Sequence, residues 1–438
     1  MSIEIITLLM FGSLVVLLAT GLPIAFVTGG LAVLFTFFLV GPAALHLVVA
    51  RIMGLMADYI LVAIPMFIFM AAMLERSGII DDMYEAMYQW MGSLRGGLAI
   101  GTVLICTILA AMVGIIGAAV VTMGLIALPV MLNRNYHKDI ALGSICAGGT
   151  LGILIPPSIL FIVYAVTAGV SVGRLFIGGV MPGLLLSGLY ITYIGIRCFL
   201  RPNDGPSVSQ QERQAISLRQ KFGLLKSLIL PVLLVAMVLG SIFGGIAAPT
   251  EAAGVGALGA ILCTVIHRRF TWQRLKEASL QTIRATCMVL WTIFGAGSFV
   301  ALYTMVGGAD FVREVIMGLP LGPWGILIVM QIFLIFMGMF LDWVGILLLC
   351  VPIFVPIITE LGFDPLWFGV LYNVNMQMSF LTPPFGYALF YLKGVAPEGV
   401  SMGDIYRAIW PFVILQAIGL ALCMIFPQII TWLPGLMF

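Results

Sequence analysis

The stretch GILIPPSILFIVY, from Gly152 to Tyr164, places two adjacent prolines inside an apolar run. A second stretch, SFLTPPFGYALFY from Ser379 to Tyr391, repeats the arrangement. Proline has no N–H to donate to the carbonyl four residues earlier, and its ring clashes with that carbonyl. The two doublets therefore predict two interrupted helices. A simple packing kink is the alternative, but it usually involves one proline and not a matched pair of doublets.

The composition of the chain is that of a membrane protein. Of its 438 residues, 62% are hydrophobic and only 9% are charged, whereas soluble domains carry about 25% charged residues. Apolar runs close to the ~20 residues of a spanning helix recur from end to end. We therefore expect an all-α polytopic membrane protein.

The sequence offers little support for an enzyme or a metal protein. It contains no HExxH motif and no P-loop, so we expect no enzyme. Its three histidines are scattered and its seven cysteines form no CxxC pair, so we expect neither a transition-metal site nor a disulfide framework. No cofactor and no nucleic-acid partner are expected.

Basic residues are distributed unevenly along the chain. With the N-terminus outside, all 20 lysines and arginines but Arg51, Arg174 and Arg313 fall in cytoplasmic segments. The positive-inside rule then predicts that both termini are periplasmic.

The two halves of the sequence share landmarks in the same order. Pro129 precedes Pro156 by the same interval that separates Pro356 from Pro383, and the N-terminal part of each half carries a proline after a glycine-rich turn. Such a series predicts an internal duplication. The charge pattern starts the two repeats on opposite sides of the membrane, so they are inverted, as in many secondary transporters.

These landmarks divide the chain into two inverted repeats and a linker. The first repeat, residues 1–200, comprises scaffold helices 1–93, a re-entrant hairpin 97–132, a broken helix 139–170 and a scaffold helix 174–200. A cytoplasmic linker covers 201–226. The second repeat, 227–438, comprises scaffold helices 227–306, a hairpin 323–358, a broken helix 365–396 and a scaffold helix 404–436.

Each doublet frees backbone carbonyls from helical hydrogen bonds. Pro156 and Pro157 release Gly152 and Ile153, and the second doublet releases Ser379 and Phe380. Unpaired carbonyls in hydrocarbon are costly, so such a break is expected only where it lines a polar site. Glycine-rich hairpin tips, at 114–119 and 338–345, offer further carbonyls.

Candidate ligands for a cation are the tip and break residues that present oxygens. They are Gly114, Gly117, Ile155, Pro156, Gly338, Asp342, Gly345, Thr382 and Pro383. Asp342 stands out because acids in apolar segments are expensive and usually functional. It suits Na⁺ coordination; protonation or capping of a helix are the alternatives.

Candidate substrate-binding residues are neutral and polar, or belong to the doublets. They are Thr150, Pro157, Ser158, Asn373, Asn375, Gln377 and Pro384. Bridging between helices is the alternative for the polar members. For Glu251, which we expect to be buried at the start of a helix, a structural role is favoured.

The segments TMGLIALPVMLNRNYHKDIALGSICAGGTLGILIPPSI, SFLTPPFGYALFYLKGVAP and PTEA resemble the large membrane subunit, of DctM type, of TRAP transporters along almost the whole chain. The resemblance implies a bacterial inner-membrane protein that imports an organic acid, commonly a carboxylate, by Na⁺ symport. It also implies an elevator mechanism, in which a transport domain of hairpins and broken helices slides against a scaffold. The implied partners are a small DctQ-type membrane subunit and a periplasmic DctP-type substrate-binding protein.

The first hairpin tip departs from many relatives of this family. It reads GIIGAA from Gly114 to Ala119 where they carry a serine-rich tip. It is similar to a subgroup associated with 2-oxo acids and other monocarboxylates. A self-sufficient sodium/carboxylate symporter of the same superfamily is the alternative function.

Overall fold

The computed structural model describes residues 1–114, 116–207 and 218–437, and every regular element within these ranges is a helix. The all-α prediction is confirmed. The helices of the first half, in chain order, are α1 (Ile3–Ala19), α2 (Ile24–Phe35), α3 (Leu45–Met56), α4 (Ala63–Arg76), α5 (Ile79–Met91), α6 (Gly97–Val113), α7 (Ile116–Asn133), α8 (Lys138–Thr150), α9 (Ile159–Ala168) and α10 (Val172–Leu200).

The second half follows after a short 3-10 turn at Pro202–Asp204. Its helices are α12 (Leu218–Phe243), α13 (Pro249–Ile266), α14 (Trp272–Met305), α15 (Gly308–Met317), α16 (Pro323–Gly338), α17 (Trp343–Glu360), α18 (Pro365–Leu381), α19 (Tyr387–Val395), α20 (Met402–Ile425) and α21 (Gln428–Met437).

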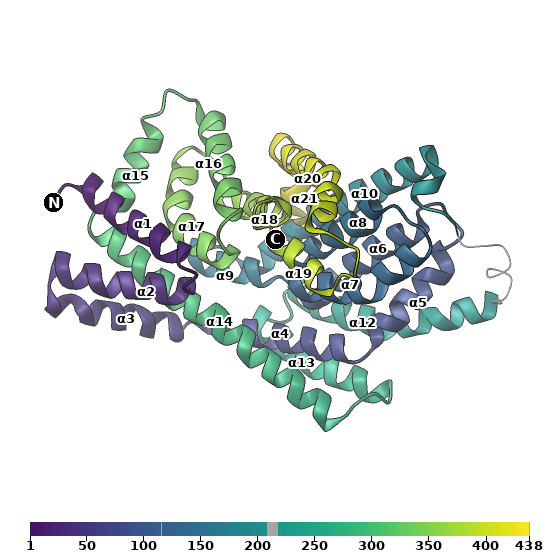
Figure 1. Cartoon of the computed structure of the whole chain (residues 1–438). Helices are drawn as coiled ribbons and strands as arrows, with labels where there is room; N and C mark the ends of the chain where they lie inside the picture. Colours follow the sequence, from purple (N-terminus) through teal and green to yellow (C-terminus); the bar gives the residue numbers. More distant parts are fainter. Residues whose placement is uncertain (115, 208–217, 438) are drawn as a thin grey trace.

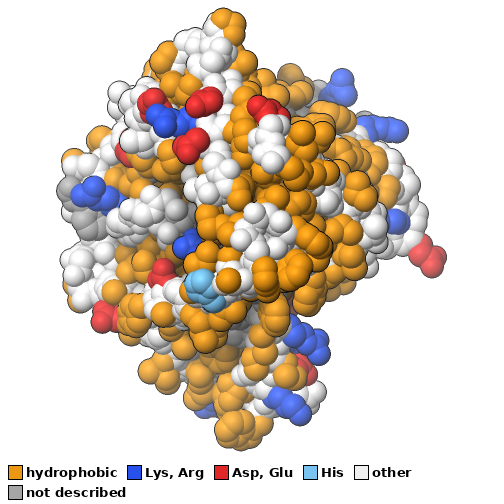
Figure 2. All heavy atoms as spheres, turned by 90° about the vertical axis from the view of Figure 1, so that its left-hand side faces the viewer, with side chains coloured by type: hydrophobic (Ala, Val, Ile, Leu, Met, Phe, Trp, Pro, Cys, Tyr) orange, Lys and Arg blue, Asp and Glu red, His pale blue; other side chains and the backbone are white. Residues whose placement is uncertain are grey.

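Seven helical segments among the described residues are long and apolar enough to cross a bilayer. They are Tyr59–Arg76, α7, α10, α13, α14, α17 and α20. Hydrophobic side chains dominate the side of the molecule that carries α1 to α3 (Figure 2). An apolar outer surface is what contact with lipid requires, and it agrees with the polytopic membrane prediction.

Helices of the two halves pack against each other in a reciprocal pattern. Helix α4 lies along α13, and α2 lies along α14. In the same way α7 packs against α19, and α17 against α9. The long α14 runs diagonally from the N-terminal helices to the far end of α13 (Figure 1). Each half is thereby completed by elements of the other half.

Helices α8 and α18 form the centre of the molecule. Every residue of α8 from Ile140 to Thr150 is buried, as is every residue of α18 from Leu366 to Leu381. Helix α8 packs against α6, α7 and α20, and α18 packs against α16 and α20. A helix that is covered on all sides belongs to a core, so polar groups on these two helices are removed from both lipid and water.

One boundary differs from the sequence prediction. The linker prediction ran to residue 226, but α12 begins at Leu218; both prolines of the predicted linker, Pro202 and Pro206, lie before this point. Helix α14, within the predicted scaffold helices 227–306, begins at Trp272, and its first turns are polar but still helical. Helix α3 has twelve residues and contains Arg51.

Candidate functional site

The first proline doublet interrupts a helix, as its sequence predicts. Helix α8 ends at Thr150, a 3-10 turn covers Leu151–Ile153, and α9 begins at Ile159. The segment 154–158 between them, here called the first break, contains no helix. All of its residues are buried.

The second doublet interrupts a helix in the same way. Helix α18 ends at Leu381 and α19 begins at Tyr387, so the second break covers 382–386. Unlike the first break, it is partly open, because Pro384 and Phe385 are exposed. Both doublets therefore stop a helix in the interior, and only one of them is fully covered.

The carbonyl of Ile153 is not free, although its sequence position predicted that it would be. The side-chain amide of Asn373 donates a hydrogen bond to it at 2.7 Å, and the hydroxyl of Ser158 donates a second one. A carbonyl oxygen has two lone pairs, and both are used here. Asn373 comes from α18, so this bond joins the first break to the centre of the second broken helix.

The two hairpins pack onto the broken helices through glycines. Gly114, with a φ of +61°, follows α6, and a Cβ there would lie 2.8 Å from the carbonyl oxygen of Pro157. Gly338 ends α16, and a Cβ there would lie 2.3 Å from the Cβ of Ser379. Neither position has room for a side chain. The structure thus brings Gly114 to the first doublet and Gly338 to the turn before the second.

Gly117 and Gly345 were expected in the unwound tips, and this placement is wrong. They lie in the first turns of α7 and α17, where backbone carbonyls point along the helix toward N–H groups of the next turn. A Cβ at Gly117 would meet the ring of Tyr391 at 3.2 Å, and one at Gly345 would meet Ile24 of α2 at 2.2 Å. Close helix packing explains both glycines.

Asp342 stands at the start of α17 and is partly exposed. Its carboxylate accepts a hydrogen bond from the N–H of Val344 at 3.3 Å, so it caps the helix. The capping role is visible, and the cation-binding role stays a prediction.

Thr382, at the start of the second break, is occupied by local hydrogen bonds. Its hydroxyl donates to the carbonyl of Met378 at 2.7 Å, and its N–H donates to that of Ser379 at 3.1 Å. Ile155, Pro156 and Pro383 lie in the breaks, as predicted. They present backbone oxygens only, and their role as cation ligands stays a prediction.

The polar residues of α18 face two directions. Asn373 reaches the first break, while the amide of Asn375 donates to the side-chain oxygen of Gln331 on α16 at 2.7 Å. Gln377 is fully buried, and neither polar atom of its side chain has a partner within the described part of the chain. A buried amide with both ends unpaired is costly and marks a place where a ligand or water is needed.

Thr150 and Gln377 occupy corresponding positions, each six residues before the first proline of its doublet. The hydroxyl of Thr150 donates to the carbonyl of Ala147 at 2.8 Å and accepts from the amide of Gln416 on α20 at 3.1 Å. The side-chain oxygen of Gln416 has no partner among the described residues. Thr150 therefore bridges α8 and α20, which is the alternative to substrate binding for this residue.

Gln331 of α16 and Gln416 of α20, which hydrogen-bond Asn375 and Thr150, were not predicted from the sequence as polar residues of the site. Both are buried glutamines within long apolar runs, and that isolation is the signal that identifies them. Glu251 is exposed and not buried as expected; its carboxylate accepts a hydrogen bond from the N–H of Ala248 at 2.9 Å. It caps α13, in keeping with the structural role that was favoured.

The described residues were also compared with the ligand sets that bind transition metals. No group of three or more His, Cys, Asp or Glu side chains that could hold a metal ion occurs within 1–114, 116–207 and 218–437. The oxygens gathered at the breaks are carbonyls, hydroxyls and amides, with Asp342 nearby. Such a set suits a hard monovalent cation better than a soft transition metal.

Comparison with known proteins places this arrangement in a family. A model described as "Tripartite ATP-independent periplasmic transporter, DctM component" matches residues 11–429. The C4-dicarboxylate TRAP transporter large permease protein DctM of Pseudomonas aeruginosa is 33% identical over 408 residues, covering 93% of each chain. That of Rhodobacter capsulatus is 31% identical over 445 residues, covering 98% of this chain and 99% of its own.

Two further comparisons concern a longer relative and a solved structure. The isethionate TRAP transporter permease protein DctMQ of Oleidesulfovibrio alaskensis is 29% identical over 97% of this chain, which covers 66% of that protein. The crystal structure of the Alcanivorax borkumensis YdaH transporter superposes with a TM-score of 0.64 at 15% identity, covering 87% of this chain and 88% of that one. At this identity the likeness concerns the fold alone.

Proposed function

The chain belongs to the DctM family of tripartite ATP-independent periplasmic transporters, and we propose that it imports an organic acid by Na⁺ symport with an elevator mechanism. Members of this family are transporter permeases and not enzymes. They work with a small DctQ-type membrane subunit and a periplasmic binding protein. The chain is accordingly a multi-pass protein of the bacterial inner membrane.

One observation supports the transport proposal above the others: two helices stop in the interior of the molecule, and a hairpin packs against each. Backbone that leaves a helix inside a membrane protein is tolerated where it is buried in protein or lines a cavity. Gly114 and Gly338 bring the hairpins within contact of the broken helices. The side-chain amide of Gln377, with both polar atoms unpaired among the described residues, and the unpaired side-chain oxygen of Asn373 lie on the same central helix.

We propose that the cation binds where a hairpin tip meets a break. In the first half, the oxygens of Gly114, Ile155 and Pro156 are available for it. In the second half, the corresponding set is Gly338, Asp342, Thr382 and Pro383. The carbonyl of Ile153 is excluded, because two side chains already occupy its lone pairs.

The organic acid is proposed to bind beside the cation. Relatives of this chain are named for C4-dicarboxylates, isethionate, sialic acid and ectoine, and most of these substrates are organic anions. The side-chain N–H groups of Gln377 and the backbone N–H groups that open α9 can recognise a carboxylate without a basic side chain. A preference for 2-oxo acids and other monocarboxylates stays a prediction from the first tip.

The elevator proposal rests on the division of the helices into two packed groups. The reciprocal pairs α4 with α13 and α2 with α14 form one group, and the hairpins with α8, α9, α18 and α19 form another. We propose that the halves are inverted repeats and that the second group slides against the first. Both termini are proposed to be periplasmic, from the distribution of lysine and arginine.

Uptake by purified protein in proteoliposomes tests this function. Labelled candidate acids are offered with Na⁺ or with choline, and with or without the small subunit and the binding protein. We expect uptake only with Na⁺ and with both partners present. Uptake that is equal in choline contradicts sodium coupling, and uptake without either partner favours the self-sufficient symporter.

A further inference from the structure

An exposed side of α10 carries an apolar groove near its C-terminal end. The groove has a volume of about 400 Å³ and is walled by Leu189, Ile196 and Leu200 of α10 and by Leu415 of α20, with Arg197 and Arg201 at one end. Its side chains are open to the surroundings, since Ile196 and Leu200 are 57% and 71% exposed. The groove lies far from the two breaks in sequence and plays no part in the proposed transport site.

The polar atoms of the groove walls are already paired within the protein. The hydroxyl of Thr192 donates to the carbonyl of Gly188 at 2.7 Å. The hydroxyl of Tyr193 accepts from Arg197 at 2.8 Å. The walls therefore offer mainly carbon, and the two hydroxyls among them already have a partner within the protein.

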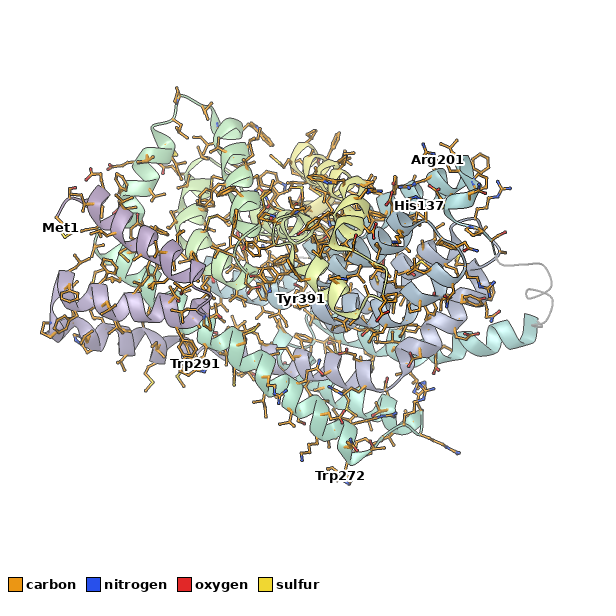
Figure 3. All side chains as sticks on the ribbon, viewed as in Figure 1. Met1, His137, Arg201, Trp272, Trp291 and Tyr391 are labelled. Atoms are coloured by element: carbon orange, nitrogen blue, oxygen red, sulfur yellow. The ribbon has the colours of Figure 1, made fainter. Side chains whose placement is uncertain are left out.

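The two arginines at the end of the groove differ in their partners. Arg197 donates from Nε to Asp204 at 2.8 Å and from Nη2 to Asp139 at 3.2 Å, so its charge is balanced. The guanidinium of Arg201 is exposed and makes no hydrogen bond or ion pair with the described residues. Figure 3 shows Arg201 at the edge of the molecule. Among the described residues, Arg201 thus contributes a positive charge without an ion-pair partner at the mouth of the groove.

The length of the groove matches one leaflet of a bilayer. Leu189 and Leu200 are separated by eleven residues of helix, which is about 17 Å at 1.5 Å per residue. Half of a typical hydrocarbon core is about 15 Å. A molecule whose apolar chain follows this stripe would bring its polar end to the level of Arg201, just past the end of α10.

We propose that this groove binds one anionic phospholipid, with an acyl chain along the α10 stripe and the phosphate at Arg201. Arginine recognises phosphate by charge-assisted, often paired hydrogen bonds. The largely apolar walls favour a lipid over a free anion. The distribution of basic residues assigns this end of α10 to the cytoplasmic side, where an anionic leaflet attracts basic groups. The proposal does not depend on sodium coupling or on the identity of the substrate.

Native mass spectrometry of the chain purified with its small subunit tests the proposal. The delipidated complex is offered phosphatidylglycerol or phosphatidylcholine, and the retained lipid is counted. We expect a preference for phosphatidylglycerol and a drop of about fivefold in Arg201→Ala, the size expected for one basic residue at an anionic surface. Arg201→Lys should keep most of the preference. Arg51→Ala removes an exposed arginine on α3 and serves as the matched control.

A second variant tests the groove itself. Ile196→Trp places a large ring in the groove at an exposed position, so it should fold normally and lower the retention of both lipids. Equal retention of the two lipids by the unmodified protein, or no change in Arg201→Ala, overturns the proposal. So does displacement of phosphatidylglycerol by inorganic phosphate alone, or a crosslink from position 196 to a protein subunit.

Discussion

The two breaks are built on the same proline doublet, yet one is sealed and the other is open. The first, 154–158, is buried along its whole length. In the second, 382–386, Pro384 and Phe385 are exposed. The prolines therefore determine where each helix stops, and other residues determine whether the unwound backbone can be reached.

Corresponding side chains account for the difference. Ser158 and Phe385 each follow their doublet directly. The serine hydroxyl bonds the carbonyl of Ile153, whereas Phe385 makes no such bond and its ring lies 6.1 Å from that of Phe340 at the second tip. Asn373 adds a second donor to the first break, and the corresponding residue on α8 is Cys146. The carbonyl that precedes the first break thus accepts two side-chain hydrogen bonds, whereas at the second break the hydroxyl of Tyr406 donates to the carbonyl of Pro384 at 3.1 Å.

The largest effect is expected at the open side, from Asp342→Asn. Asparagine caps a helix about as well as aspartate, so the stability of α17 should be kept while the charge is lost. We expect sodium-dependent uptake to fall about tenfold or more, the loss that corresponds to about 1.4 kcal/mol or more of cation binding. If the variant keeps the uptake rate and the sodium dependence of the unmodified protein, Asp342 only caps the helix and does not bind the cation.

The sealed side is tested by Asn373→Ala. The change removes the inter-helix donor to the carbonyl of Ile153 and should lower the free energy of unfolding by about 1–3 kcal/mol. Hydrogen exchange at the N–H groups of 152–155 should speed up. Asn375→Ala is the matched control, because it loses its bond to Gln331 but leaves the first break intact. Equal exchange in both variants would show that Asn373 does not hold the break.

A smaller effect is expected from Ser158→Ala. The variant loses one local hydrogen bond to a carbonyl that keeps Asn373 as a partner, so the free energy of unfolding should fall by about 1 kcal/mol. Thermal unfolding in detergent measures it. The reciprocal variant Phe385→Ser should raise stability or leave it unchanged if the missing hydroxyl is what keeps the second break open. A marked loss of stability in Phe385→Ser would contradict this explanation.

The smallest effect is expected outside both breaks, from Glu251→Ala. The carboxylate caps the exposed start of α13, so its removal should cost about 1 kcal/mol or less. Uptake per folded molecule should stay unchanged. A loss of uptake as large as that of Asp342→Asn would show that transport also depends on residues outside the two breaks.

The helical fold and both interruptions were predictable from the sequence, because proline acts on the backbone wherever it stands. The doublets located both breaks. The first turns of α14 are helical although they are polar, so hydropathy alone does not indicate where this helix begins. The end of the linker was missed because 218–226 is polar as well as helical.

The site was predictable only in outline. Local sequence showed that the carbonyl of Ile153 loses its helical partner, but not that Asn373 approaches from 220 positions away along the chain. Gly117 and Gly345 were assigned to the tips because glycine serves equally in turns and in close helix packing, and only the fold distinguishes these uses. Gln331 and Gln416 were missed for a similar reason, since their partners lie on other helices.

An electron cryo-microscopy structure of the complex in sodium and a transported acid tests the central claim most directly. The account predicts density for a cation where the hairpin tips meet 154–158 or 382–386, absent when choline replaces sodium, with the acid beside Gln377 or Asn373. Empty breaks under conditions of full transport, or density for both ligands elsewhere in the molecule, would contradict it.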